Sequence, residues 1–279
     1  MTESDQLIKD LFVNKFEMVI NLPPWMLPSH LVKQYREIPG LAIVEMAGRD
    51  SVAAAIKCVK EKGLTDLLPV YTYTGTEYGE WSSIEEAVRR LSQRLKIKVH
   101  DLIVIGSPGF WHALNGRFIS TLIEKYGYFT PCIGCHSYLH STRIPLATLL
   151  GRKSVISGER ESHDGREKIN QIPEALDAYE KIANRFNIPL LMPLRHVKDG
   201  REVEDILGFK WGEGMEQLGC TLSGNYRNIH GGCNIKKKNV QDYLNEFVLP
   251  CTDKIIASYV GGNIPDHERI AKGVLDGNS

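Results

Sequence analysis

Short runs of apolar residues recur between residues 41 and 194, and polar or glycine-containing segments separate them. Such runs, of about four to eight residues, are typical of strands buried on both faces of a parallel sheet. The expected strands are residues 41–46, 67–74, 101–106, 154–157 and 189–194. In the longer segments between them, apolar residues recur every three or four positions, which predicts amphipathic helices.

Helices are expected at residues 51–62, 82–95, 116–126 and 173–186, with another between Cys135 and Leu150. The segment 107–115 is expected to be a loop, because Pro108 and Gly109 are both helix breakers. Strands that alternate with helices predict an α/β fold. We expect a parallel, doubly wound sheet of about five strands with helices on both faces.

This pattern divides the chain into three parts. Residues 1–38 are expected to form an N-terminal helical and loop extension, residues 39–200 the α/β domain, and residues 201–279 a less regular C-terminal elaboration. In an open parallel sheet, ligands bind beyond the carboxyl ends of the strands, where the strand order reverses. Polar segments that contain glycine follow three of the expected strands, so we expect the functional site there.

Composition narrows the class of protein. The 279 residues include 34 Lys and Arg against 34 Asp and Glu, so the formal net charge is zero. Zero net charge argues against binding nucleic acid by bulk electrostatics, although local basic groups such as Lys236–Lys238 can contact a phosphate backbone. No apolar run approaches the roughly 18 residues of a membrane helix, and the N-terminus is polar and acidic. We therefore expect a cytoplasmic protein.

The segment Ala47-Gly48-Arg49-Asp50-Ser51 connects the first expected strand to a helix. Backbone N–H groups at such a junction converge, and the helix N-terminus favours negative charge. Gly48 permits close approach of an anion, and Ser51 and Arg49 add donors, which favours a phosphate site; the alternative is a loop in which Asp50 only caps the helix. The Walker sequence G-x-x-x-x-G-K-[ST] is absent.

The six cysteines are not expected to form disulfides, because cytosolic thiols stay reduced. Cys132-Ile-Gly-Cys135 lets two sulfurs converge on one ion or cluster, with Gly134 in a tight turn. A second such pair is missing, so a third ligand has to come from Cys220 or Cys233. Three thiolates with an open fourth position suit a reactive metal centre, and the alternatives are a redox pair or unligated thiols. His136 and His140 fall on one helical face and can act as ligands or orient one.

Together these features resemble the PP-loop ATP pyrophosphatases of the adenine nucleotide alpha hydrolase-like superfamily. Their pyrophosphate loop is usually written S-G-G-x-D-S, which Gly48, Asp50 and Ser51 match, whereas Met46 and Ala47 replace its Ser and first Gly. The order of C-x2-C, fourth strand, Gly158 and a following acidic residue is similar to the tRNA thiolation branch. The resemblance covers roughly residues 38–235.

The resemblance implies a nucleotide-binding HUP-type fold in residues 39–200, with ATP and Mg²⁺ as ligands. It implies that three cysteines hold a [4Fe–4S] cluster, with zinc as the alternative metal. Cys132 and Cys135 match two ligands, Cys220 is expected to be the third, and Cys233 is the alternative. Asp164 matches a catalytic acidic residue, and His163 beside it can shuttle a proton. The residues expected to hold ATP are Ala47, Gly48, Arg49, Asp50, Ser51, Tyr73 and Gly158.

The implied activity is that of an ATP-dependent sulfurtransferase, a transferase of tRNA processing. A substrate oxygen is adenylated, pyrophosphate leaves, and sulfur from the cluster displaces AMP. The expected partners are ATP, tRNA or a small nucleotide-like substrate, a sulfur donor that the sequence does not identify, and a second copy of the chain in a homodimer. The alternatives are an amide-forming ligase, a thionucleotide desulfurase, and a zinc-stabilised nucleotide-binding module without turnover.

Overall fold

The computed structural model describes residues 18–19, 27–128, 130–212, 217–233 and 236–277. Its centre is a seven-stranded sheet in which every pairing between described strands is parallel. The strands lie in the order β1 (Met18–Val19), β6 (Ile103–Gly106), β3 (Asp66–Tyr73), β2 (Leu41–Glu45), β7 (Val155–Ile156) and β8 (Leu190–Leu191), and β5 (Lys98–Val99) pairs with the start of β3. The expected parallel α/β fold is confirmed. The five expected strands are present, and β1 and β5 extend the sheet.

The strand order reverses once in the middle of the sheet. The chain moves outward from β2 to β3 and β6, and then returns to place β7 on the other side of β2. Because the loops after β2 and β7 leave in opposite directions, a crevice opens between the carboxyl ends of these two strands.

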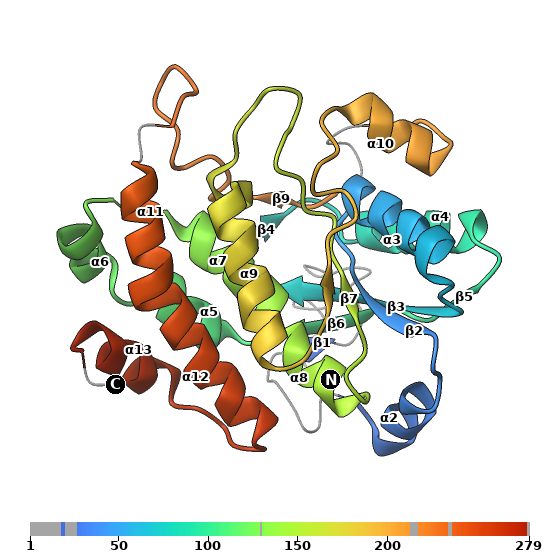
Figure 1. The fold of residues 1–279 in the computed structure, drawn as a ribbon, viewed down its shortest axis with the longest axis horizontal. Coiled ribbons are helices and arrows are strands. Elements are labelled where there is room, and N and C mark those ends of the chain that lie inside the picture. The colour runs from blue at the N-terminus through green and yellow to red at the C-terminus, as the bar shows by residue number, and fades with distance from the viewer. Residues whose placement is uncertain (1–17, 20–26, 129, 213–216, 234–235, 278–279) are drawn as a thin grey trace, which may run out of the picture.

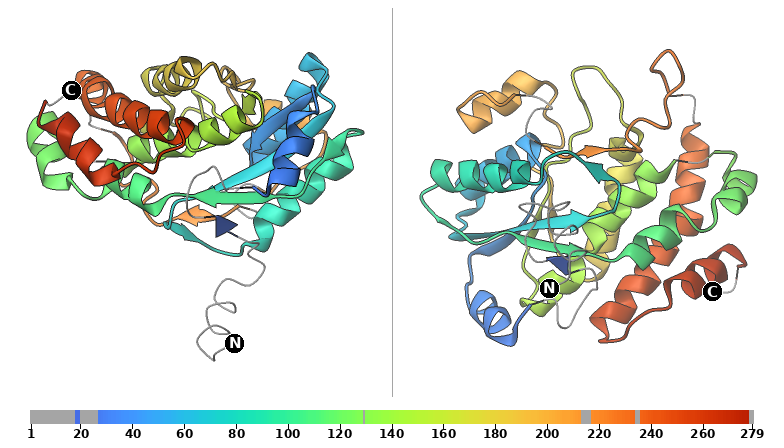
Figure 2. Two further views of the ribbon diagram at one scale, coloured as in Figure 1. Left: turned by 90° about the horizontal axis from the view of Figure 1, so that it is seen from below. Right: turned by 180° about the vertical axis from the view of Figure 1, so that it is seen from behind.

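Helices cover both faces of the sheet. Successive side chains of β2 point to opposite faces, so both faces have to be covered. Leu41 and Ile43 belong to one hydrophobic core, whereas Ala42 and Val44 belong to the other. One face carries α3 (Arg49–Lys62), α4 (Ser82–Arg94) and α10 (Gly200–Leu207). The other carries α5 (Pro108–Asn115), α7 (Pro131–Ser141), α8 (Arg143–Leu149), α9 (Pro173–Arg185) and α12 (Leu249–Val260). Figures 1 and 2 show the two groups of helices on their separate sides.

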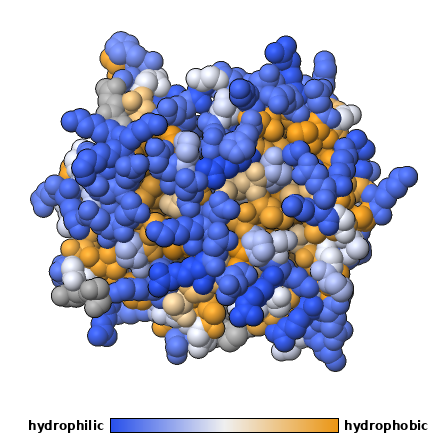
Figure 3. Space-filling model, in the orientation of Figure 1, coloured by the Kyte–Doolittle hydropathy of each residue, from blue (hydrophilic) through white to orange (hydrophobic). Residues whose placement is uncertain are grey.

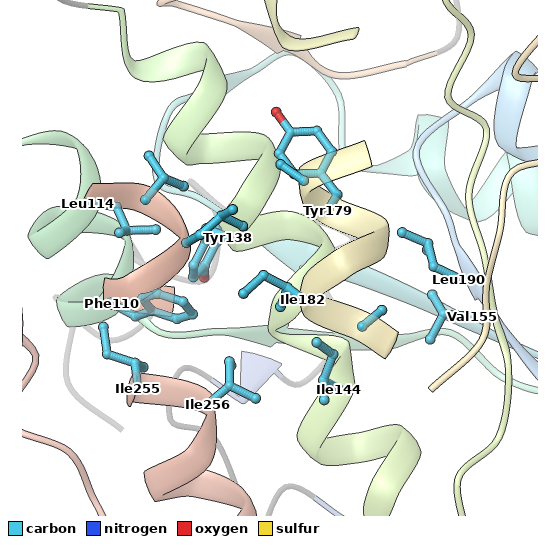
Figure 4. Close-up of a cluster of buried hydrophobic side chains, with 14 of the residues drawn as sticks. Phe110, Leu114, Tyr138, Ile144, Val155, Tyr179, Ile182, Leu190, Ile255 and Ile256 are labelled. Carbon is cyan, nitrogen blue, oxygen red and sulfur yellow. The ribbon is translucent and has the colours of Figure 1, made fainter. Parts of the chain in front are cut away.

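Five helices contribute aromatic and branched side chains to the larger core. Phe110, Tyr138, Ile144, Tyr179 and Ile255, one from each helix, are all buried. Figure 4 shows these side chains converging in the space between the helices. Because full burial of such a side chain contributes about 1.5–3 kcal/mol, this core fixes α7 firmly against the sheet.

Two expectations about local structure are wrong. Residues 108–115 form α5 rather than a loop, because Pro108 occupies the first turn of the helix, where its missing N–H costs nothing. The C-x2-C is not a tight turn, since α7 begins at Pro131 and both cysteines lie in its first turns. Gly134 is needed for packing instead: a Cβ there would lie 2.4 Å from Asn115 Oδ1.

The C-terminal part is more regular than its sequence pattern indicates. Residues 237–260 form α11 (Lys237–Tyr243), a π-helical segment (Leu244–Val248) and α12 in direct succession, and α13 (His267–Leu275) follows. Pro250 lacks a backbone N–H, and the wider π-helical turns before it accommodate that loss.

A short antiparallel ribbon brings the C-terminal part back to the sheet. β4 (Glu77–Tyr78) follows β3 and pairs with β9 (Gly219–Cys220), so that Glu77 lies opposite Cys220. Most of the expected N-terminal extension, residues 1–17 and 20–26, lies outside the described residues. Its described remainder supplies β1 and α2 (Ser29–Arg36), with a bend at Leu27 before the helix.

Hydrophilic residues cover most of the face in Figure 3, with hydrophobic residues visible between them. Within the described part of the chain, no helix has both the length and the apolar composition needed to cross a bilayer.

Candidate functional site

The loop between β2 and α3 has the form of an anion site. Gly48 is the N-cap of α3, and Arg49, Asp50 and Ser51 form its first turn. Ser51 Oγ accepts hydrogen bonds from the backbone N–H groups of Ala47 and Gly48, at 3.1 and 3.0 Å. It donates to Gly48 O at 2.7 Å. The serine therefore organises the loop at the positive end of the helix dipole.

Gly158, directly after β7, touches this helix terminus. A Cβ at Gly158 would lie 2.6 Å from both Asp50 C and Ser51 N, which are backbone atoms. Only glycine allows so close an approach. The loops that follow β2 and β7 therefore form one continuous surface in the crevice.

Positive charge surrounds the loop. The Asp50 carboxylate lies 3.0 Å from Arg49 Nε and 2.9 Å from Arg160 Nε. Arg160 is 1% exposed, and its buried Nη1 has no hydrogen-bond partner among the described residues. Residues 47–51, which we call the phosphate loop after their expected ligand, line a cavity of about 350 Å³ together with Arg160 and Lys168. We call it the loop cavity. A buried guanidinium with a free donor suits an anionic ligand.

Of the two expected catalytic residues, His163 lies at the loop cavity and Asp164 does not. His163 lines the loop cavity, with Nδ1 3.3 Å from Arg160 Nη2. Burial and the charges of Lys168 and Arg160 lower the pKa of His163 to about 4, so its imidazole is neutral near pH 7. Asp164 is exposed, accepts a hydrogen bond from Gly200 N at 2.7 Å, and is not among the residues that line the loop cavity.

Tyr73 also lies outside the lining of the loop cavity, whereas Thr72 and Thr74 on either side belong to it. The ring of Tyr73 packs against Trp81, with centroids 6.0 Å apart. Glu77 holds the segment after β3, because it accepts hydrogen bonds from Thr74 N at 2.7 Å and Gly75 N at 2.8 Å.

Three of the four candidate cysteines surround a second cavity of about 550 Å³, which we call the cysteine cavity. Cys132 and Cys135 reach it from α7, and Cys220 reaches it from β9. Trp111 Nε1 donates to Cys135 Sγ at 3.3 Å, and Cys220 Sγ lies 3.2 Å from Thr76 Oγ1. Burial raises the pKa of the Cys132 and Cys135 thiols, so they stay protonated unless a cation binds them.

Cys233 lies elsewhere. It forms a β-bridge with Arg227 and packs against the larger hydrophobic core. It is not among the residues that line the loop cavity or the cysteine cavity.

The two cavities share part of their walls. The residues that line both are Thr76, Cys135, His136, Lys168, Gln171 and Cys220. The phosphate loop and the three cysteines therefore border adjoining spaces at the carboxyl end of the sheet.

A buried polar cluster lies at the loop cavity, whose lining includes Glu45, His136, Arg143 and Glu159. Glu45 is the last residue of β2, and its Oε1 lies 2.7 Å from His140 Nδ1 and 3.3 Å from Arg143 Nη1. Glu159 Oε1 lies 2.8 Å from His136 Nδ1 and 3.2 Å from His140 Nε2. Burial lowers the pKa of His140, but the two carboxylates outweigh it and raise that pKa to about 9.

Sequence reasoning identified the two histidines but missed Glu45 and Arg143. The available signal was a carboxylate inside the apolar run of β2, since charged residues are rarely buried without a partner.

Comparisons with known proteins give a relative by sequence and likenesses to solved structures. No family model matches the sequence. Among solved structures, the U34-tRNA thiolase NcsA from Methanococcus maripaludis, solved with its [4Fe-4S] cluster, is 14% identical with a TM-score of 0.39, over 87% of this chain and 79% of that chain. A predicted subunit of tRNA methyltransferase from Methanocaldococcus jannaschii is 15% identical with a TM-score of 0.33, over 60% of this chain and 73% of that chain.

The relative is the uncharacterized protein MJ0009 of Methanocaldococcus jannaschii. It is 40% identical over 231 residues, which cover 80% of this chain and 82% of the relative. Identity at this level over most of both chains means that the chain belongs to the same family as MJ0009.

Proposed function

We propose that the protein is an ATP-dependent sulfurtransferase of the PP-loop type. It adenylates a substrate oxygen and replaces that oxygen with sulfur at a three-cysteine [4Fe–4S] centre. The observation that carries this proposal is the shared wall of the loop cavity and the cysteine cavity. A substrate bound along that wall reaches both an ATP α-phosphate and the cysteines.

The loop cavity is proposed to bind ATP through its phosphates. The N-terminus of α3 and the cations beside it stabilise the negative charge that develops on the leaving pyrophosphate, together with the Mg²⁺ that accompanies ATP. Asp50 positions Arg49 and Arg160 through its two carboxylate oxygens. The residues proposed to hold the nucleotide are Ala47, Gly48, Arg49, Asp50, Ser51 and Gly158, with the adenosine beside the strand end around Tyr73.

The cysteine cavity is proposed to hold a metal cluster with one open position. This is supported by Cys132 and Cys135 from α7 and Cys220 from β9, which all line a cavity of about 550 Å³. When bound, such a cluster supplies an iron that can carry sulfur. Trp111 and Thr76 each place a polar group against one of the sulfurs, as partners that tune cluster ligands do.

His163 and Asp164 are proposed to handle protons. The neutral imidazole of His163 lies beside Arg160 at the loop cavity, where it can accept a proton from the attacking group. The role of Asp164 rests on its sequence position alone, six residues after Gly158.

We propose tRNA as the substrate, with a small nucleotide-like compound as the alternative. Arg166, Lys168 and Arg227 line the cysteine cavity together with the cysteines. Three cations at one cavity favour a polyanionic backbone, even though the whole chain has no net charge.

The test is a reaction of the anaerobically reconstituted protein with ATP, Mg²⁺, sulfide and tRNA that lacks thiolated nucleosides. The expected result is AMP and pyrophosphate, with a thionucleoside in the digested tRNA by mass spectrometry. Cys220→Ala is expected to remove the thionucleoside. If ATP is not cleaved to AMP with tRNA or with nucleotides while the cluster is intact, the proposal is wrong.

A further inference from the structure

We propose that His136, His140 and Glu159 form a second metal site, which binds a divalent transition-metal ion separately from the cysteines. The three side chains offer two imidazole nitrogens and one carboxylate oxygen, all within 4.8 Å of one another. Two histidines and a carboxylate are a ligand set that zinc, iron(II) and manganese accept. The proposal is independent of the sulfurtransferase function.

The distances fit a shared ion. Glu159 Oε1 lies 2.8 Å from His136 Nδ1 and 3.2 Å from His140 Nε2. Ligand atoms about 2.1 Å from a tetrahedral zinc ion lie roughly 3.4 Å from each other, so small side-chain rotations suffice. His140 Nε2 is buried, and Glu159 Oε1 is the ligand atom beside it. The side chain of His140 is only 4% exposed, so its Nε2 is shielded from competing water.

Each proposed ligand is also held by a further polar group, as metal ligands are. His140 Nδ1 lies 2.7 Å from Glu45 Oε1, and His136 Nε2 lies 2.8 Å from Asn170 Nδ2. Gln171 Nε2 donates to the second oxygen of Glu159. An imidazole whose other nitrogen donates to a carboxylate is the usual arrangement at a metal. If the side-chain amide of Asn170 is flipped, its oxygen faces His136 Nε2. That oxygen then accepts a hydrogen bond from His136, as Glu45 does from His140.

The fold fixes the site and leaves one side open. The histidines are four residues apart on α7, and Glu159 directly follows Gly158 at the end of β7. His136 and Glu159 line the loop cavity, so the ion has an open coordination position there. Glu45 and Glu159 offset the charge of the ion. An oxygen ligand, either water or a phosphate or carbonyl oxygen of the substrate, would take that position.

The test uses the full chain with Cys132, Cys135 and Cys220 all changed to Ser, so that the thiolates of the cysteine cavity cannot take the metal. Cobalt(II) is titrated into the metal-free protein. We expect one ion per chain, with a visible ligand-field spectrum and no thiolate-to-cobalt charge transfer. The side chain of His136 lies at the wall of the loop cavity. Adding His136→Gln to this variant is expected to weaken cobalt binding by more than about 100-fold. The matched control is the exposed His196→Gln, which leaves binding unchanged.

A milder variant distinguishes weaker metal binding from loss of the folded structure. Asn170→Ala removes only the group beside His136 Nε2 and is expected to weaken cobalt binding by roughly 10- to 100-fold. In the wild-type chain, His136→Gln removes one zinc ion and leaves the cysteine-bound metal in place. The proposal is overturned if the folded triple-serine chain binds no cobalt, or if neither His136→Gln nor Asn170→Ala changes the affinity. Either result makes the cluster an ion-pair network of the protein alone.

Discussion

At the scale of residues, the absence of a Cβ atom at Gly158 lets two loops of the site touch. The α-carbon of Gly158 faces the backbone of Asp50 and Ser51, and these atoms cannot move without shifting the start of α3. The phosphate loop and the loop after β7 are therefore aligned by contact between two backbones.

Gly158→Ala is expected to destabilise the protein by about 1–3 kcal/mol, as overpacking of a close contact does, and to weaken nucleotide binding. Thermal unfolding and ATP titration measure the two effects. Gly232→Ala is the control, because a Cβ there would meet its nearest atom at an ordinary 3.5 Å. Equal melting temperatures for Gly158→Ala and Gly232→Ala would contradict the close contact at Gly158.

Arg160 is the other residue on which the loop cavity depends. Arg160→Lys keeps a positive charge but loses the planar donor that faces Asp50, and Arg160→Gln loses both. We expect ATP affinity to fall by roughly 10-fold or more for Arg160→Gln and by less for Arg160→Lys, since a charged hydrogen bond contributes about 1.5–3 kcal/mol. Isothermal titration with ATP measures this, and the exposed Arg185→Gln is the control. Unchanged affinity in Arg160→Gln would remove Arg160 from the phosphate site.

At the scale of elements, α7 connects the two halves of the site. Its first turns carry Cys132 and Cys135, and its next turns carry His136 and His140. The helix is fixed by α5, whose C-terminal Asn115 lies against Gly134, and by the core in Figure 4. A shift of α5 is therefore expected to displace Cys132 and Cys135 on α7.

The contact between α5 and α13 is expected to depend on pH. Burial lowers the pKa of His267 to about 4, and the ring lies parallel to Phe110 with Nε2 2.6 Å from Tyr259 OH. The unfolded chain binds this proton near pH 6.5 but the folded chain does not, so stability is expected to fall as pH decreases from about 6.5 to 4. Urea unfolding across this range measures the slope. His267→Phe should reduce it, and an unchanged slope would exclude His267 as its source.

The elements that the sequence predicted correctly are those whose burial leaves a local pattern. Parallel strands buried on both faces are continuous apolar runs, which is why β2, β3, β6, β7 and β8 were found. Helix α5 was missed because Pro108 favours a helix start as well as a turn, and the choice depends on packing against α7. The continuous helix at residues 237–260 was missed because its π-helical turns break the 3.6-residue period.

At the scale of the whole molecule, the site collects segments that lie far apart in the sequence. The phosphate loop and Gly158 were predictable, because polar segments after parallel strands meet at the switch in strand order. Cys220 was preferred over Cys233, but its place at the cysteine cavity could not be derived from the sequence, because the pairing of β4 with β9 spans more than a hundred residues and has no local signal. The same holds for Glu45 of β2 and Arg143 of α8, which are 98 residues apart in the sequence and 3.3 Å apart in the fold.

The central claim is that Cys132, Cys135 and Cys220 hold an iron–sulfur cluster beside the phosphate loop. The most direct measurement is iron and sulfide per chain after anaerobic reconstitution, in wild type, Cys220→Ala and Cys233→Ala. We predict that Cys220→Ala loses the cluster and its visible absorption, whereas Cys233→Ala keeps the wild-type content. Loss of iron only in Cys233→Ala, or a wild-type protein that takes up zinc and no iron, would contradict the account.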